Sequence, residues 1–389
     1  MDLNGYFDPV SLDRPEFHLL PEKYSFSRNI STHTPDHPIK QIENYQVALI
    51  GIPQDKNAFI SGSGKAPDYI RGMLYQLKKI NNNVKVYDLG NLKITDNIKD
   101  SYFAIRDVTL ELLEREVIPF FIGGSQDLAF GVLLAMEKLD GIQQILSIDP
   151  RIDFWPDKEK KLHSRNYLDY ILDKEKKEKF IFSNIAHQAY FVADDQFDIM
   201  EQEYMESLRL GEIRGNLRLA EPLIRDSDFI SIDMNVVRHS DAPGVTIPSP
   251  NGLFGDELCT LTRYAGLSEK VKVCGIFECD PSRDLNEQTS HLAAQSVWYF
   301  IDGLSHRIKE NPVDTPEHTK KFIITMNETD QELIFHKSTL SERWWIEIPV
   351  KNPATNHNFF VSCSYEDYQM ACNHEIPDRW WRFLHRLGN

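Results

Sequence analysis

Residues 144–153 of this chain read QILSIDPRID, an apolar run followed by Asp149, Arg151 and Asp153. Similar short apolar runs recur between residues 45 and 277, separated by stretches with helical periodicity. Near-continuous apolar strands that alternate with amphipathic helices are typical of a parallel sheet with helices on both faces. In such sheets ligands bind beyond the carboxyl ends of the strands. The polar residues that follow each run are therefore the first candidates for a functional site.

Polar groups follow three further apolar runs. The sequence GGSQD (123–127) follows IPFFI, DMN (233–235) follows FISI, and ECDP (278–281) follows VKVCGIF. Carboxylates spaced two or four residues apart beyond a strand can converge on a hard cation. The ordinary structural explanation of any one such motif is a helix cap. Several strand ends with such groups together favour a metal site.

In this order, the motifs resemble those of the ureohydrolase superfamily: arginase, agmatinase and, most closely, formimidoylglutamase. That family carries G-G-x-H, D-A-H-x-D, S-x-D-x-D and a late Glu, where this chain has GGSQ, DPRID, SIDMN and FECDP. The segment GIPQDKNAFISGSGKAPDYIR (51–71) resembles an early family segment. The resemblance covers about residues 45–310. It implies an α/β fold, a three-layer α/β/α sandwich with a mainly parallel sheet, and often an oligomeric assembly.

The resemblance also implies two Mn²⁺ ions that share a hydroxide, the nucleophile that attacks an amidine or guanidine carbon. In the family, two His and four Asp hold these ions. Three of the six positions keep the family ligand: Asp149, Asp153 and Asp233. At the other three, the two His and one Asp of the family are replaced by Gln126, Arg151 and Asn235.

These replacements affect the two predicted metal sites to different extents. The ligands left for one ion offer only oxygen atoms, which suit Mg²⁺, Ca²⁺ or, weakly, Mn²⁺; they are Gln126, Asp149, Asp153 and Asp233. The other ion needs the positions of Arg151 and Asn235, but a guanidinium has no lone pair for a metal and asparagine offers only a neutral carbonyl. We predict a degenerate centre with no cofactor, in which Arg151 pairs with Asp149 or Asp233. One bound divalent ion is the alternative.

The resemblance assigns a substrate role to two further residues. Glu278 matches the late Glu that contacts the substrate guanidinium in arginase-like enzymes, and it is the one catalytic candidate. A cap or an ion pair is its structural alternative. His163 falls near the family's substrate loop, although a loop histidine is more often a surface residue. The predicted substrate-binding residues are Glu278, Arg151 and His163.

The chain organisation predicts three parts. Residues 1–44, rich in Pro, His and Asp, predict an extended N-terminal arm, and residues 45–315 predict the ureohydrolase-like α/β domain. Short strands follow, so residues 316–389 predict a small mixed α/β appendage packed on the body. Four tryptophans would form a ligand platform or bury the appendage against the body or a neighbouring subunit: Trp344, Trp345, Trp380 and Trp381.

Composition narrows the class of protein. The 389 residues include 59 Asp and Glu against 43 Lys and Arg, and a net charge of -16 disfavours nucleic acid and anionic membrane surfaces as partners. Five cysteines without a C-x-x-C pair indicate a reducing compartment. The start of the chain has no signal-peptide pattern, and no apolar run reaches the roughly 20 residues of a membrane span. We expect a cytoplasmic protein.

We therefore predict a protein with a decayed binuclear manganese site, a pseudoenzyme used for binding a small anionic or amidine ligand or a protein partner, and a homo-oligomer. The alternative is an active hydrolase of linear amidines such as formimidoylglutamate, which would use one residual metal. A third possibility is another reaction in the inherited pocket, with Arg151 binding an anionic substrate.

Overall fold

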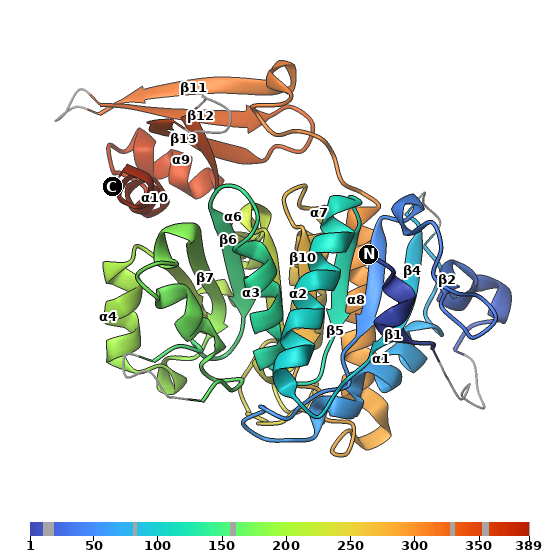
Figure 1. Cartoon of the computed structure of the whole chain (residues 1–389). Coiled ribbons are helices and arrows are strands. Elements are labelled where there is room, and N and C mark those ends of the chain that lie inside the picture. The colour runs from blue at the N-terminus through green and yellow to red at the C-terminus, as the bar shows by residue number, and fades with distance from the viewer. Residues whose placement is uncertain (11–18, 81–83, 156–160, 327–330, 352–357, 389) are drawn as a thin grey trace.

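The computed structural model describes residues 1–10, 19–80, 84–155, 161–326, 331–351 and 358–388 (Figure 1). Within these residues, ten strands form the main sheet: β1 (Phe7–Asp8), β2 (Ile30–Thr32), β3 (Val47–Gly51), β4 (Val86–Leu92), β5 (Ile118–Ile122), β6 (Gln143–Ile148), β7 (Phe180–His187), β8 (Glu206–Arg209), β9 (Phe229–Asp233) and β10 (Val273–Phe277). Their order is β1-β4-β3-β5-β10-β9-β6-β7-β8, with β2 paired to β4. Only the short strand β1 runs antiparallel to its neighbour in this sheet.

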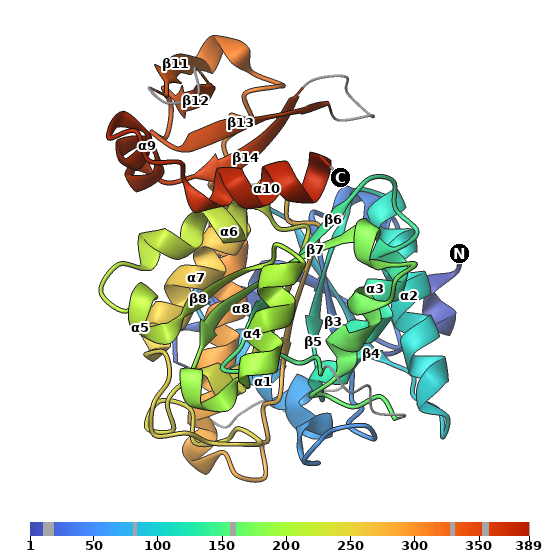
Figure 2. The same cartoon turned by 90° about the vertical axis from the view of Figure 1, so that its left-hand side faces the viewer.

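Helices cover both faces of the sheet (Figure 2). On one face lie α1 (Ala66–Leu74), α5 (Leu210–Ile213), α6 (Glu221–Asp226), α7 (Gly255–Leu267) and α8 (Gln288–Leu304). On the other face lie α2 (Ile98–Glu114), α3 (Ala129–Met136) and α4 (Asp194–Gln202). Each face has its own hydrophobic cluster, and every residue of the central strands β9 and β10 is buried. The predicted three-layer sandwich is confirmed.

The N-terminal segment differs from the extended arm that we predicted. Its strands β1 and β2 both pair with β4, and Phe7 and Phe26 are 1% and 0% exposed. The apolar residues of this segment are too widely spaced to show a period, so only their contacts with the distant strand β4 reveal that they pack. Residues 11–18 of the predicted arm lie outside the described residues.

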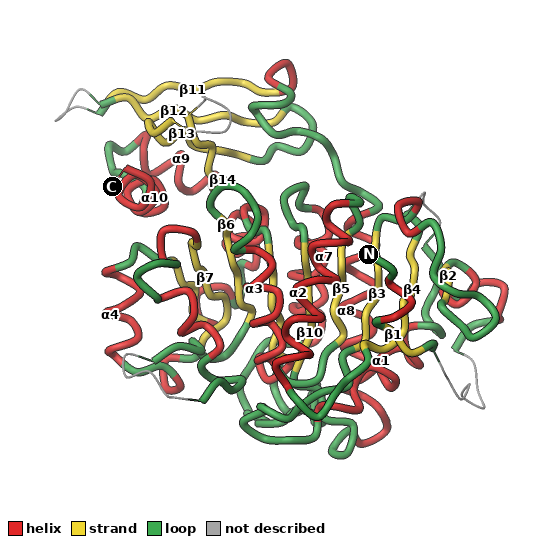
Figure 3. The backbone as a smooth tube through the Cα atoms, viewed as in Figure 1, coloured by secondary structure: helices red, strands yellow, loops and turns green. Residues whose placement is uncertain are grey.

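The C-terminal residues form a second, smaller sheet (Figure 3). Its four antiparallel strands follow chain order: β11 (Thr319–Thr325), β12 (Glu332–Ser338), β13 (Trp344–Lys351) and β14 (Asn358–Cys363). Two helices follow them, α9 (Tyr365–Cys372) and α10 (Asp378–Gly388). Three of the four tryptophans are buried here, whereas Trp381 is 41% exposed. Ile181, near the start of β7, belongs to the hydrophobic cluster of this appendage, which places the appendage at the amino edge of the main sheet.

None of the helices in the described ranges has the length and apolar character needed to cross a membrane.

Candidate metal and substrate site

The four polar strand ends lie side by side because β5, β10, β9 and β6 are consecutive neighbours in the main sheet. Gln126 begins a short 3₁₀ helix after β5, Glu278 directly follows β10, Asp233 ends β9, and Asp149 directly follows β6. These strands are mutually parallel, so their carboxyl ends meet at one edge. With neighbouring strands about 4.8 Å apart, the four groups form one row.

A small pocket opens on this row. It is lined by most of the predicted site residues and three others: Gln126, Arg151, Asp153, Ser164, Arg165, Asp233, Asn235, Ile247 and Glu278. Its free volume is about 10 Å³, close to that of a single water-sized sphere. In this conformation the pocket has no room for a substrate, so a ligand would have to displace side chains at its mouth.

Glu278 connects two of the strand ends. Its Oε1 accepts a hydrogen bond from the backbone N–H of Gln126 at 2.8 Å, and its Oε2 accepts one from the Thr246 hydroxyl at 2.7 Å. The residue adopts a φ of 66°, in the left-handed region that costs energy for a side chain of this size. Burial raises the pKa of Glu278 to about 7, because a buried carboxylate loses its hydration. Near neutral pH this group can therefore hold or release a proton.

Three aspartates concentrate negative charge in the same place. Asp149, Asp153 and Asp233 are 1%, 4% and 4% exposed. Burial raises the pKa of all three, and the negative charge of Asp149 raises the pKa of Asp153 and Asp233 further. Oδ1 of Asp149 accepts a hydrogen bond from the backbone N–H of Arg151 at 2.8 Å, but no donor among the described residues reaches its Oδ2. These three aspartates therefore favour the binding of a proton or a cation.

Arg151 does not pair with these aspartates as we predicted. Its guanidinium lies over the ring of Phe191, 4.5 Å from the centroid, and it forms no ion pair with any acidic side chain in the described ranges. The aromatic face offers an attractive alternative site for a cation close to solvent. The charge of Arg151 still lowers the pKa of Asp153 and Asp233, but burial outweighs this effect.

Asn235 places an N–H group at the position where the sequence resemblance predicts a metal-binding carboxylate. Its Oδ1 accepts the backbone N–H of Ile247 at 2.6 Å, which fixes the orientation of the amide. Its Nδ2 then donates to Oδ1 of Asp233 at 2.7 Å and to the Thr246 hydroxyl at 3.1 Å. One oxygen of Asp233 is thus already engaged by a protein donor.

His163 is not among the residues that line the pocket, although we predicted a substrate role for it. Its Nδ1 accepts the backbone N–H of Arg165 at 3.1 Å, and its ring lies 6.0 Å from that of Phe59. The loop brings Arg165 to the pocket instead, with its guanidinium 3.9 Å from the Phe59 ring centroid. Burial and the nearby charge of Arg151 lower the pKa of Arg165. Arg165 was not predicted from the sequence, although its place two residues after His163 was an available signal.

Tyr167 is a second site residue that was not predicted from the sequence. Its side chain is fully buried, and its hydroxyl accepts a hydrogen bond from Nε2 of Gln126 at 3.3 Å. Nε2 of Gln126 also donates to the Ser231 hydroxyl at 3.3 Å. A tyrosine inside an apolar-looking loop gives no functional signal by itself. These two bonds hold the Gln126 amide in place.

A binuclear metal centre does not fit these residues. Arg151 offers no lone pair, and Asn235 directs an N–H at the carboxylate that would bridge the ions. One divalent cation fits better, because Asp149 has a free buried oxygen beside two further carboxylates. Across the part of the chain that the structure describes, no three His, Cys, Asp or Glu side chains converge closely enough to hold an ion as they are placed. Binding one would require the aspartates to move together.

Comparison with known proteins gives a consistent family. The model of the arginase family matches residues 45–302. A formimidoylglutamase of Staphylococcus haemolyticus is 28% identical over 270 residues, which cover 66% of this chain and 85% of that protein. The formimidoylglutamase of Bacillus subtilis is 25% identical over 316 residues, covering 73% of this chain and 98% of that protein.

Solved structures show the same fold. Formiminoglutamase of Trypanosoma cruzi, determined with Mn²⁺, superposes with a TM-score of 0.64 at 22% identity, covering 69% of this chain and 97% of that one. The Bacillus subtilis formimidoylglutamase gives a TM-score of 0.65 at 20% identity, covering 76% of this chain and 97% of that one. Our prediction that no cofactor is bound is wrong, because the similar Trypanosoma cruzi structures contain Mn²⁺ and point to a divalent metal cofactor. From its matched sequence and its fold, this chain belongs to the arginase family.

Proposed function

We propose that this protein is a formimidoylglutamase-like member of its family that binds one divalent cation and has lost efficient amidine hydrolysis. The cation would be held by Asp149, Asp153 and Asp233, with Gln126 as a neutral oxygen ligand. The observation that carries this proposal is the 2.7 Å hydrogen bond from Asn235 Nδ2 to Asp233, because it replaces a metal contact with an N–H donor. The protein then serves as a binding protein for a small anionic or amidine ligand.

Charge supports the proposed cation. Three buried aspartates with raised pKa lie together at the carboxyl edge, and Arg151 stacks on Phe191 without forming an ion pair with them. Uncompensated buried carboxylates are costly, and a divalent cation or bound protons would relieve that cost. The Mn²⁺ in the similar formiminoglutamase structure supports a divalent cation over bound protons. Oxygen ligands suit hard cations such as Mg²⁺, Ca²⁺ or Mn²⁺.

The remaining side chains suit ligand binding. A pair of ions would supply a hydroxide at neutral pH, whereas this chain offers oxygen ligands for one ion at most, the three aspartates and Gln126. Arg151 and Arg165 line the mouth of the pocket and can bind an anionic group of a ligand. Glu278 can accept a hydrogen bond from an amidine or hold a proton, since its pKa is raised to about 7 by burial.

An active amidine hydrolase with one cation is the second candidate. The observation that favours it is the same raised pKa of Glu278, because a group that titrates near neutral pH can act as a general acid or base. Such a group lies beside the carboxylates, at the edge of the sheet where related folds bind their substrates. Under this alternative Glu278 transfers protons, whereas under the first it only orients the ligand.

One experiment separates the two candidates. The wild-type protein is loaded with Mn²⁺, its metal content is measured by elemental analysis, and the release of formamide from formimidoylglutamate and of urea from arginine and agmatine is followed. We expect at most one ion per chain and no turnover approaching a typical enzyme rate of about 10 s⁻¹. Turnover at that rate would establish the second candidate, and two ions per wild-type chain would refute both.

A restoration variant is the positive control. The triple change Gln126→His, Arg151→His and Asn235→Asp restores the six ligand types of the family. We expect it to bind more Mn²⁺ per chain than the wild type. If the triple variant and the wild type bind the same amount, the assignment of these three positions is wrong.

A further inference from the structure

A second and much larger cavity lies at the opposite edge of the main sheet. Its volume is about 740 Å³, within the range of small-molecule sites. One wall comes from the amino ends of the body strands, where Gln143 starts β6 and Asp228 and Lys272 precede β9 and β10. The other wall comes from β13, β14 and α10 of the appendage. The cavity shares no lining residue with the pocket at the carboxyl edge.

Part of this cavity is apolar. From the appendage, Phe359, Phe383 and Leu387 line it, and from the body, Ile142 and Ile181 do so. Ile142 is 37% exposed at the rim, whereas Phe383 is 3% exposed. Aromatic and aliphatic walls on two sides suit a flat apolar group.

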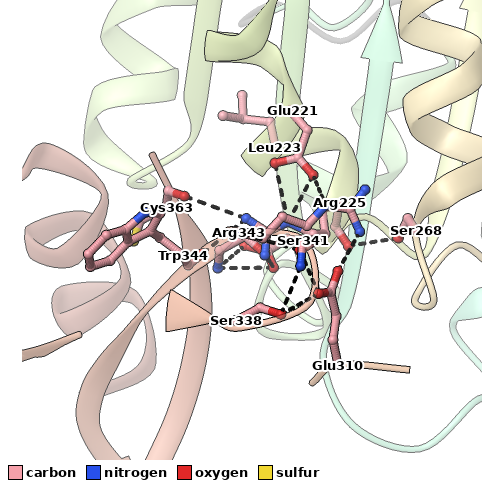
Figure 4. A network of polar contacts seen from close by, with 12 residues as sticks. Glu221, Leu223, Arg225, Ser268, Glu310, Ser338, Ser341, Arg343, Trp344 and Cys363 are labelled. Atoms are coloured by element: carbon pink, nitrogen blue, oxygen red, sulfur yellow. Dashed lines mark hydrogen bonds and ion pairs between the residues drawn. The ribbon is translucent and has the colours of Figure 1, made fainter. Parts of the chain in front are cut away.

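The buried acidic groups of the cavity wall are already compensated. Asp226 pairs with Arg379 at 2.7 Å, and Asp228 pairs with Lys272 at 3.0 Å. Glu310 pairs with Arg343 at 2.9 Å, within the polar network that joins the body to the appendage (Figure 4). These carboxylates therefore offer little to a cationic ligand.

Two cations of the wall are not fully satisfied. The side chain of Arg225 is 7% exposed, and its guanidinium lies 4.4 Å from the ring centroid of Trp345. Its Nε forms an ion pair with Glu221 at 3.0 Å, and its Nη2 donates a hydrogen bond to the Trp344 carbonyl at 2.9 Å. Its buried Nη1 has no acceptor in the part of the chain that is described. The Lys270 ammonium makes no ion pair with a described acidic residue either. A buried N–H without an acceptor costs free energy that an incoming oxygen would recover.

We propose that this cavity binds a small aromatic carboxylate. The carboxylate accepts hydrogen bonds from Arg225 and Lys270, and the ring packs against Phe359 and Phe383. Three acidic side chains on the cavity rim oppose an anion, but they are exposed, so solvent and salt screen their charge: Asp140, Glu269 and Asp314. This proposal does not depend on the chemistry of the carboxyl edge.

Isothermal titration calorimetry of the full chain tests the proposal with a matched pair of probes, 3-phenylpropionate and 3-phenylpropylamine. We expect saturable binding of the carboxylate and at least tenfold weaker binding of the amine, which has the same ring and the opposite charge. Absence of carboxylate binding by the wild type, or tighter binding of the amine, would overturn the proposal.

Variants then locate the binding. We expect Lys270→Gln and Arg225→Gln each to weaken carboxylate binding at least fivefold, while the exposed Lys99→Gln leaves it unchanged. Because Arg225→Gln disturbs a buried network, Ile142→Trp provides an independent test: the larger side chain fills the rim and should block binding. Ile94→Trp, at a position 46% exposed outside the cavity, is its control. If Lys270→Gln and Ile142→Trp both bind 3-phenylpropionate with unchanged affinity, the proposed site in the larger cavity is refuted.

Arg151 provides the last control, because the pocket at the carboxyl edge also contains arginines. We expect Arg151→Ala to bind 3-phenylpropionate as the wild type does. If this change abolishes binding, the probe occupies the carboxyl-edge pocket and the inference about the larger cavity is wrong.

Discussion

The two edges of the main sheet bury acidic side chains in opposite ways. At the carboxyl edge, Asp149, Asp153 and Asp233 have raised pKa values, and Arg151 stacks on a ring beyond ion-pair distance. At the amino edge, Asp226 pairs with Arg379 and accepts hydrogen bonds from the backbone and hydroxyl of Ser362. Both edges are acidic and buried, but only one leaves its negative charge uncompensated.

The carboxyl edge is therefore a candidate binding site, whereas the paired charges at the amino edge hold the body and the appendage together. Burial by itself perturbs acidic groups at both edges, as the raised pKa of Glu206 at the amino edge shows. A compensated group holds two parts of the chain together, and its removal mainly affects stability. An uncompensated group has affinity left for a ligand, which makes it a candidate for function. Four predictions test this contrast.

The largest effect is expected from Arg379→Ala. Arg379 donates to Glu206 at 3.0 Å and to Asp226 at 2.7 Å, so its loss leaves two buried carboxylates without a cation. We expect the free energy of unfolding to fall by about 3–5 kcal/mol in urea denaturation at pH 8. Arg209→Ala removes an arginine whose side chain is 61% exposed, and it should cost less than about 1 kcal/mol. Equal effects of the two changes would contradict a role of Arg379 in holding the appendage on the body.

A pH dependence of stability is expected from Glu206. Burial raises the pKa of this group from 4.5 to about 7, so the folded state binds the proton more tightly than the unfolded state. Its contribution to stability is complete below pH 4.5 and falls as the pH rises to about 7. At about 1.4 kcal/mol per pH unit, the wild type should lose about 3 kcal/mol over this range relative to Glu206→Gln. Parallel stability curves for the two proteins would refute this assignment.

A metal effect of similar size is expected at the carboxyl edge. With Mn²⁺ at about 100 times its dissociation constant, the wild type should gain about 2.7 kcal/mol in unfolding free energy. Asp149→Asn removes the carboxylate that has a free buried oxygen and should abolish the gain. Asp195→Asn, on the exposed surface of α4, should retain it. A gain that persists in Asp149→Asn would place the cation elsewhere.

The smallest effect is expected from Arg151→Ala. Since Arg151 stacks on Phe191 and makes no ion pair with a described acidic group, its loss should cost about 0.5–2 kcal/mol, the range of a cation–π contact. A double-mutant cycle with Phe191→Ala should give a coupling energy of that size. A loss of several kcal/mol would instead indicate the buried ion pair with Asp149 or Asp233 that the sequence suggested.

The row of strand ends was predictable from sequence because both of its components are local patterns. An apolar run predicts a buried parallel strand, and the polar residue that follows must then lie at the carboxyl edge. Gln126, Asp149, Asp233 and Glu278 were therefore expected to lie together, and their strands are indeed neighbours in the structure. The order of the strands was not predictable in this way, because it depends on contacts such as the hydrogen bond between Gln126 and Glu278, which spans 152 positions of the chain.

The orientations of the site side chains were not predictable in the same way. Arg151 had two favourable partners, the aspartates and an aromatic ring, and only the packing of Phe191 beside it decided between them. The amide of Asn235 is oriented by the backbone of Ile247, twelve residues away. Arg165 enters the pocket because its loop folds back over Phe59. Each of these outcomes depends on a contact that has no local signature.

The sequence by itself determined the layer order of the body, the family resemblance, and which side chains follow each strand, because periodicity and residue chemistry are properties of short segments. The tertiary structure decided the packing of Phe7 and Phe26 against the sheet, the closure of the carboxyl-edge pocket to about 10 Å³, and the larger cavity beneath the appendage. The physical reason is that such cavities and contacts arise where segments that are distant in the chain meet, as Phe7 of β1 meets Leu92 of β4. Their shape follows from how the two surfaces pack, and no period in either segment encodes it.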